Sequence, residues 1–168
     1  MSIDFIYPAC YAETLLMETL GFVCADNHQN GDGEIIKIMD IRKNIPSDEI
    51  LIGVMDKPKG INPSHVPEKY KDIKTGSHGI CLKRKPNSRR YIIYINHLFE
   101  DWIEIVGNSK NIPRPYPNND SKFKAEMKDS KLSKKAILIN YINAIKDAQP
   151  TAFNQIKNWI ELIQKNKL

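Results

Sequence analysis

Two short hydrophobic segments, each followed by acidic residues, constrain the fold of this chain most. The first covers residues 50–56 and ends at Asp56, and the second covers residues 90–95 and precedes Glu100 and Asp101. Runs this short and this rich in β-branched residues are typical of buried strands in an α/β sheet. Because ligands of open α/β sheets gather outside the carboxyl ends of the strands, acids at that edge mark a place for a divalent cation.

Size and composition predict a globular chain that is long enough to bury a core. Of its 168 residues, 41% are hydrophobic and 27% are charged. No apolar run approaches the roughly 20 residues that span a bilayer, and the N-terminal segment lacks the pattern of a signal peptide. Three cysteines, Cys10, Cys24 and Cys81, share no metal-ligand spacing. These features predict reduced thiols and a cytoplasmic protein with no membrane partner.

Charge is distributed unevenly along the chain. Residues 1–82 contain 8 Lys and Arg against 12 Asp and Glu, whereas residues 83–168 contain 17 against 8. This polarity fits an acidic, metal-carrying sheet beside a surface that contacts phosphate. The alternative is codon bias in an AT-rich genome, which would enrich Lys, Asn and Ile without any function.

Periodicity predicts an α/β fold with a small, mostly parallel sheet flanked by helices. Strands are expected at residues 3–7, 22–25, 50–56, 79–83 and 89–95, the last two joined as a hairpin. Helices are expected at residues 9–20, 34–43 and 97–106. Prolines and glycines interrupt residues 57–77, which predicts a long surface loop.

A Pro- and Asn-rich linker at residues 108–119 separates two predicted parts of the chain. Residues 1–107 are expected to form the α/β domain, and residues 120–168 an all-helical C-terminal extension packed on it. The last helix places four apolar residues at near-heptad spacing: Phe153, Ile156, Ile160 and Ile163. This stripe is most simply explained by core packing, and a partner-binding or homodimer face is the alternative.

Three segments carry a family resemblance. They are Ala12-Glu13-Thr14-Leu15-Leu16, Val54-Met55-Asp56-Lys57-Pro58 and Phe99-Glu100-Asp101-Trp102. Together they resemble a Toprim-like domain, the small α/β fold of topoisomerases, primases and OLD-family nucleases. That family holds Mg²⁺ with a glutamate after the first strand and an Asp-x-Asp at the end of a later strand, and a subset adds an acid before a Trp. Here Pro58 replaces the second aspartate, and the strand-end glutamate would fall near Tyr7 or Pro8.

The resemblance implies that Asp56 ligates Mg²⁺, with Glu100 as a second ligand and Glu100 or Glu13 as general base. One or two carboxylates plus substrate phosphates are enough for a single Mg²⁺ ion. The implied activity is Mg²⁺-dependent phosphodiester cleavage, or nucleic-acid binding alone if the acidic set is degenerate. Each acid also has a structural alternative: a capping or turn residue for Asp56, a solvated helix position for Glu100 and a helix-dipole contact for Glu13.

A basic cluster surrounds the turn of the predicted hairpin. Its members are Lys83, Arg84, Lys85, Arg89 and Arg90. A basic hairpin that lies along a phosphate backbone releases counterions, and without an interleaved aromatic residue its contacts select sequence weakly. The charges would otherwise protect a sheet edge. The sequence therefore predicts a nucleic-acid-binding or nuclease-like protein, and the alternative is a non-enzymatic interaction module, homodimeric through its C-terminal helices.

Overall fold

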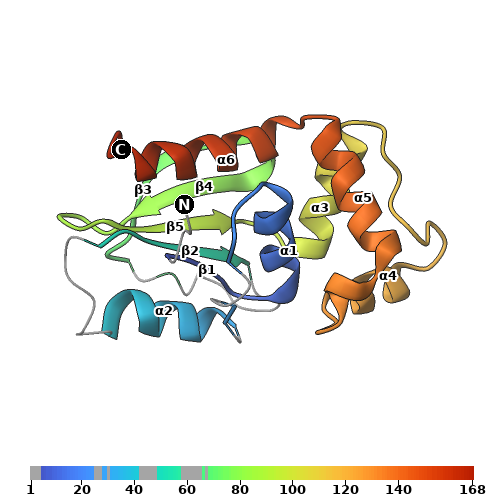
Figure 1. Ribbon diagram of the computed structural model, residues 1–168, viewed down its shortest axis with the longest axis horizontal. Helices are drawn as coiled ribbons and strands as arrows, with labels where there is room; N and C mark the ends of the chain where they lie inside the picture. Colours follow the sequence, from blue (N-terminus) through green and yellow to red (C-terminus); the bar gives the residue numbers. More distant parts are fainter. Residues whose placement is uncertain (1–4, 25–27, 30, 42–48, 58–65, 67) are drawn as a thin grey trace.

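The computed structural model describes residues 5–24, 28–29, 31–41, 49–57, 66 and 68–168, which form a five-stranded sheet with helices on both faces (Figure 1). The strands are β1 (Ile6–Pro8), β2 (Leu51–Asp56), β3 (Lys71–Thr75), β4 (Ile80–Arg84) and β5 (Arg90–Ile95). Their order across the sheet is β1-β2-β5-β4-β3. The first three strands in this order are parallel, and β4 is antiparallel to both β5 and β3.

The α/β class is confirmed, but the prediction of a mostly parallel sheet is wrong because the sheet is mixed. Only residues 85–89 join β4 to β5, and a parallel crossover needs about a dozen residues or more. A similarly tight connection joins β3 to β4 through η2 (Ser77–Gly79), where His78 and Gly79 have positive φ angles of 53° and 75°. These two hairpins force the alternation of strand direction.

Two predicted segments differ from the structure. The segment expected to be a surface loop contains β3, whose five residues are all exposed and give no apolar alternation to detect. The strand expected at residues 22–25 is irregular over residues 22–24, although Phe22 and Cys24 are buried. The side chains of Phe22 and Cys24 pack in the core, but the backbone of residues 22–24 does not pair with a strand.

Helices occupy each of the predicted helical segments. They are α1 (Tyr11–Thr19), α2 (Asp32–Ile41), α3 (Phe99–Asn108), α4 (Asp120–Met127), α5 (Ala136–Asp147) and α6 (Thr151–Gln164), with a short turn η3 (Leu132–Lys134). Helix α2 covers one face of the sheet, and α1 and α6 share a core with the other (Figure 1). Among the described residues, none of the helices has the length and apolar character of a membrane span.

Helix α2 approaches β2 closely at a glycine. A Cβ atom on Gly53 would lie 2.7 Å from Cγ2 of Ile35, which is a severe overlap. Glycine is therefore required at this point of the strand, because the backbone itself forms the surface on which Ile35 packs. The contact fixes α2 over the centre of the parallel strands.

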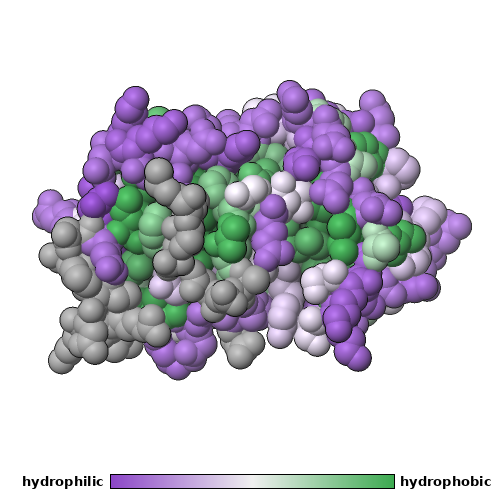
Figure 2. Space-filling model, in the orientation of Figure 1, coloured by the Kyte–Doolittle hydropathy of each residue, from purple (hydrophilic) through white to green (hydrophobic). Residues whose placement is uncertain are grey.

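The C-terminal helices belong to the same core as the sheet. The α6 stripe of Phe153, Ile156, Ile160 and Ile163 is at most 1% exposed and packs with residues of α1, α3 and the sheet. Hydrophilic side chains cover the outward side of α6 (Figure 2). The stripe is thus used for core packing, and a partner or homodimer contact through the C-terminal helices would have to use other residues.

Candidate functional site

Asp56 caps a helix at the carboxyl end of β2. Its Oδ2 atom accepts a hydrogen bond of 2.7 Å from the backbone N–H of Phe99, the first residue of α3. Leu98, which precedes the helix, has an apolar side chain that cannot provide this acceptor. A carboxylate at a helix N-terminus satisfies an otherwise unpaired N–H and interacts favourably with the helix dipole. Asp56 therefore has the capping role that is the structural alternative to binding a metal ion.

Glu13 caps α1 from within the helix. It is fully buried, and its Oε2 atom accepts a hydrogen bond of 2.7 Å from the backbone N–H of Cys10. This is the reciprocal half of a capping box, in which the third residue of a helix reaches back to the residue before it. Burial raises the pKa of the Cys10 thiol and the neighbouring Glu13 carboxylate raises it further, so Cys10 is a poor nucleophile.

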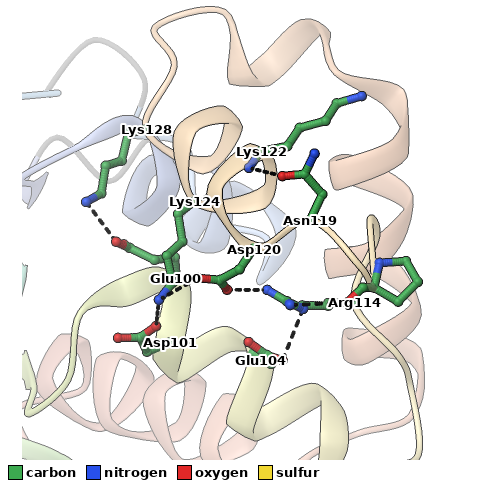
Figure 3. A network of polar contacts seen from close by, with 10 residues as sticks. Glu100, Asp101, Glu104, Arg114, Asn119, Asp120, Lys122, Lys124 and Lys128 are labelled. Atoms are coloured by element: carbon green, nitrogen blue, oxygen red, sulfur yellow. Dashed lines mark hydrogen bonds and ion pairs between the residues drawn. The ribbon is translucent and has the colours of Figure 1, made fainter.

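Glu100 belongs to a network that joins α3 to α4 (Figure 3). It is 3% exposed, and its Oε1 atom lies 2.7 Å from Nζ of Lys128. On the next position of α3, Asp101 pairs with Lys124 at 2.8 Å. Lys124 of α4 and Lys128, which caps its C-terminus, thus neutralise the acids that start α3. Glu100 is buried and paired, so it is not a solvated helix position.

The same network extends to the segment before α4. Arg114 binds Glu104 of α3 at 3.2 Å and also pairs with Asp120, the first residue of α4 (Figure 3). The hydrogen bond from Arg114 lowers the pKa of Asp120 most, and the hydrogen bond from Lys124 lowers it further. Residues 108–119, expected to be a linker, are therefore anchored to α3 through Arg114.

The predicted magnesium site remains a prediction. Asp56 and Glu100 lie near the carboxyl end of the parallel strands, but one carboxylate oxygen of each is already engaged by the protein. A metal ion at Glu100 would compete with the Lys128 ammonium group. Within the described residues, no group of three or more His, Cys, Asp or Glu side chains is placed to hold a metal ion. These contacts fit capping and ion-pair roles better than a Mg²⁺ centre, which prefers carboxylates open to water and phosphate.

Replacing Asp56 with alanine should separate the capping role from a metal-binding role. We expect the free energy of unfolding to fall by about 0.5–2 kcal/mol, as for removal of a helix cap. Millimolar Mg²⁺ should change the Tm of wild type and Asp56→Ala equally little. Urea unfolding and thermal melting with and without Mg²⁺ measure both effects, with the exposed Asp147→Ala as the control. A Tm increase with Mg²⁺ that Asp56→Ala abolishes would instead establish the metal site.

The predicted basic cluster divides between the two faces of the sheet. On the face of α2, Lys83 pairs with Asp72 at 2.6 Å and Lys85 lies 3.7 Å from Asp40. On the same face, Arg90 donates to the backbone carbonyl of Met39 in α2. These three cations anchor the hairpin to α2 and to β3, so the cluster that is continuous in sequence is not one surface.

The other two cations of the cluster lie on the face of α6. The Arg84 guanidinium lies over the ring of Tyr91 at 5.3 Å, and its Nε donates to the carbonyl of Ser88 at 2.9 Å. Arg89 donates to the side chain of Asn166, beyond the end of α6. Tyr91 donates from its hydroxyl to the carbonyl of Leu168 at 3.1 Å.

These contacts gather cations from three distant segments at one end of the molecule, where Figure 1 places the β4–β5 turn beside the end of α6. Lys71 of β3 is the register partner of Arg84. Lys165 and Lys167 flank Asn166 and are exposed. We call this set the hairpin–terminus surface: Lys71, Arg84, Arg89, Lys165 and Lys167. Its lysines form no ion pair with a carboxylate in the part of the chain that the structure describes.

No family model, curated protein or solved structure matches this chain. The resemblance to Toprim-like domains stays a prediction from three short segments.

Proposed function

We propose that the protein binds the phosphate backbone of nucleic acid through the hairpin–terminus surface and does not cut it. The observation that carries the proposal is the pair of contacts from Arg89 to Asn166 and from Tyr91 to Leu168. They join the basic turn of the hairpin to the lysines at the end of α6. Five cations from three segments then form one binding surface for an anionic polymer.

The surface has the chemistry that phosphate binding needs. Each Lys or Arg that neutralises a phosphate releases condensed counterions, and this release supplies most of the free energy of non-specific binding. Arg84 is fixed by the Tyr91 ring and by the Ser88 carbonyl, so less side-chain entropy is lost when it meets a phosphate. Tyr91 is 3% exposed and its ring cannot stack on a base, which favours backbone contact over sequence selection.

The contacts of the three candidate acids favour binding without cleavage. Asp56 caps α3, Glu13 caps α1 and Glu100 pairs with Lys128, so each carboxylate has a role within the fold. In-line cleavage of a phosphodiester would need these groups to hold one or two metal ions beside the scissile bond. If the protein cleaved nucleic acid with Mg²⁺ and Asp56→Ala abolished the cleavage, the proposal that it binds without cutting would be rejected.

Neutralising two exposed lysines tests the binding surface with little risk to the fold. The double variant Lys165→Ser, Lys167→Ser should bind labelled duplex DNA or RNA more weakly and reduce the slope of log K against log[salt] by about 2, roughly 0.9 for each phosphate that is no longer neutralised. Fluorescence anisotropy measures both quantities. Lys110→Ser with Lys157→Ser is the matched control, with the same charge change at exposed positions. Equal weakening in both double variants would assign the effect to net charge and reject the surface.

A further inference from the structure

A pocket of about 190 Å³ lies between α1 and η3 and plays no part in the contacts described above. It is bounded by side chains of three segments that are far apart in sequence. The residues that bear on its chemistry are Tyr11, Thr14, Glu18, His28, Ser130 and Ser133. A concave site with a few convergent polar groups is where a small ligand group is expected to bind.

One wall of the pocket is a stacked pair of rings. The rings of Tyr11 and His28 have centroids 4.0 Å apart and an interplanar angle of 21°. Tyr11 is 38% exposed, so the pair is accessible from the solvent side. A planar group can extend such a stack, and base–aromatic stacking is the usual way in which proteins hold unpaired bases.

Thr14 contacts both the Cys10 carbonyl and the His28 ring at the edge of the pocket. The Thr14 hydroxyl lies 2.9 Å from the carbonyl of Cys10, which can only accept, so the hydroxyl donates there. The same hydroxyl lies 3.1 Å from Nδ1 of His28 and has only a lone pair left to offer it. With the hydroxyl donating to Cys10, the His28 tautomer that fits this contact carries its proton on Nδ1.

Glu18 adds a carboxylate to the pocket. Burial raises the pKa of this carboxyl group, because its charged form is only partly solvated. The side chain is also exposed, so a ligand that donates hydrogen bonds can reach it and stabilise its charged form. The Glu18 carboxylate thus favours a ligand edge that is rich in donors, and the hydroxyls of Ser130 and Ser133 can donate to an acceptor beside that edge.

Cations flank the serines of the pocket. Lys131 and Lys134 belong to the same short turn as Ser133 and are exposed. A phosphate attached to a bound base could be neutralised by these two lysines. The pocket therefore combines a stacking wall and nearby positive charge, the two features of single-strand binding, with a carboxylate that can bond to a base edge.

We infer that this pocket binds an unpaired guanine of a single-stranded nucleic acid, stacked on Tyr11 and His28 and bonded to Glu18. Guanine is the base whose Watson–Crick edge presents two adjacent donors, N1–H and N2–H₂, which match the two oxygens of a carboxylate. Its O6 acceptor, next to these donors, suits a serine hydroxyl. The inference rests on the proposed binding of nucleic acid and adds to it a preference for strand and base.

The test compares single strands with a duplex. The probes are a labelled oligothymidylate with one central guanosine, the same strand with adenosine, and a labelled duplex. Wild type should prefer the guanosine strand. Tyr11→Ala should weaken binding of that strand by about 5- to 150-fold, the range for removal of one stacking interaction, and leave duplex binding unchanged. Tyr11→Phe should retain the affinity because it keeps the ring.

The acid is tested separately. Glu18→Gln should remove the preference for guanosine over adenosine, whereas Glu161→Gln on α6 should preserve it. Circular dichroism melting checks that each variant is folded. Equal affinity of wild type for the two strands, or unchanged single-strand binding by folded Tyr11→Ala, would overturn the inference while duplex binding continues. Wild-type protein that binds neither single strand nor duplex would instead reject the proposed function and the inference with it.

Discussion

Replacing Trp102 with alanine is expected to lower the free energy of unfolding by about 3–5 kcal/mol, the range for removing a large aromatic side chain from a core. Trp102 is fully buried in α3. Its ring lies 5.6 Å from that of Phe99 and 5.9 Å from that of Phe153 in α6, between centroids. The side chain therefore links α3 to α6 within the core that these helices share with the sheet.

Urea unfolding followed by circular dichroism measures this destabilisation. Ile105→Ala on the same helix is the control, because Ile105 is 39% exposed and should cost less than about 1 kcal/mol. Trp102→Phe should cost less than Trp102→Ala, since it keeps a ring and removes an Nε1–H that has no hydrogen-bond partner among the described residues. One transition is expected in every variant. Two separate transitions in wild type would show that residues 120–168 unfold independently of the sheet.

Reversing two charges on the hairpin–terminus surface is expected to have the largest effect on binding. Arg84→Glu with Arg89→Glu removes two of the proposed phosphate contacts and places two negative charges beside the remaining lysines. We expect the affinity for duplex at low salt to fall by roughly 10²-fold and the salt slope to decrease by about 2. Lys110→Glu with Lys157→Glu changes the net charge equally at other exposed positions and should weaken binding much less.

The charge reversal must be separated from damage to the hairpin. Arg84 contacts the Tyr91 ring and the Ser88 carbonyl, so its replacement also removes local stabilisation. Arg84→Gln with Arg89→Gln removes the two positive charges, keeps polar side chains that can donate hydrogen bonds and introduces no negative charge. This variant should show the same decrease in salt slope as the charge reversal while its Tm stays close to that of wild type. A folded Gln variant with wild-type affinity would reject the surface.

The sequence predicted two kinds of element: amphipathic helices and short, continuously apolar strands. The apolar faces of α1, α3 and α6 and the buried runs of β2 and β5 follow from periodicity alone, and these residues form the observed cores. Strand β3 could not be found in this way because all of its residues are exposed. The mixed sheet was foreseeable, since a short turn between residues 79–83 and 89–95 already requires antiparallel strands.

The candidate site was less accessible to sequence reasoning because its contacts are tertiary. Asp56 was placed correctly at a strand end, but its partner, the N–H of Phe99, is 43 residues away. Successive side chains of a strand point to opposite faces of the sheet, so the sequence alone places Arg84 on the face opposite Lys83 and Lys85. In contrast, no local pattern connects Arg89 with Lys165 and Lys167, because Asn166 reaches the hairpin only through the packing of α6.

The most direct test of the proposed function is a salt titration of wild-type protein on a labelled duplex. If the hairpin–terminus surface contacts phosphate, log K should fall linearly with log[NaCl] between about 50 mM and 200 mM, with a slope of roughly −0.9 for each cation engaged. The Arg84→Glu, Arg89→Glu variant should give a shallower line. Absence of binding by wild type at low salt, or parallel lines for wild type and the variant, would show that this surface does not bind phosphate.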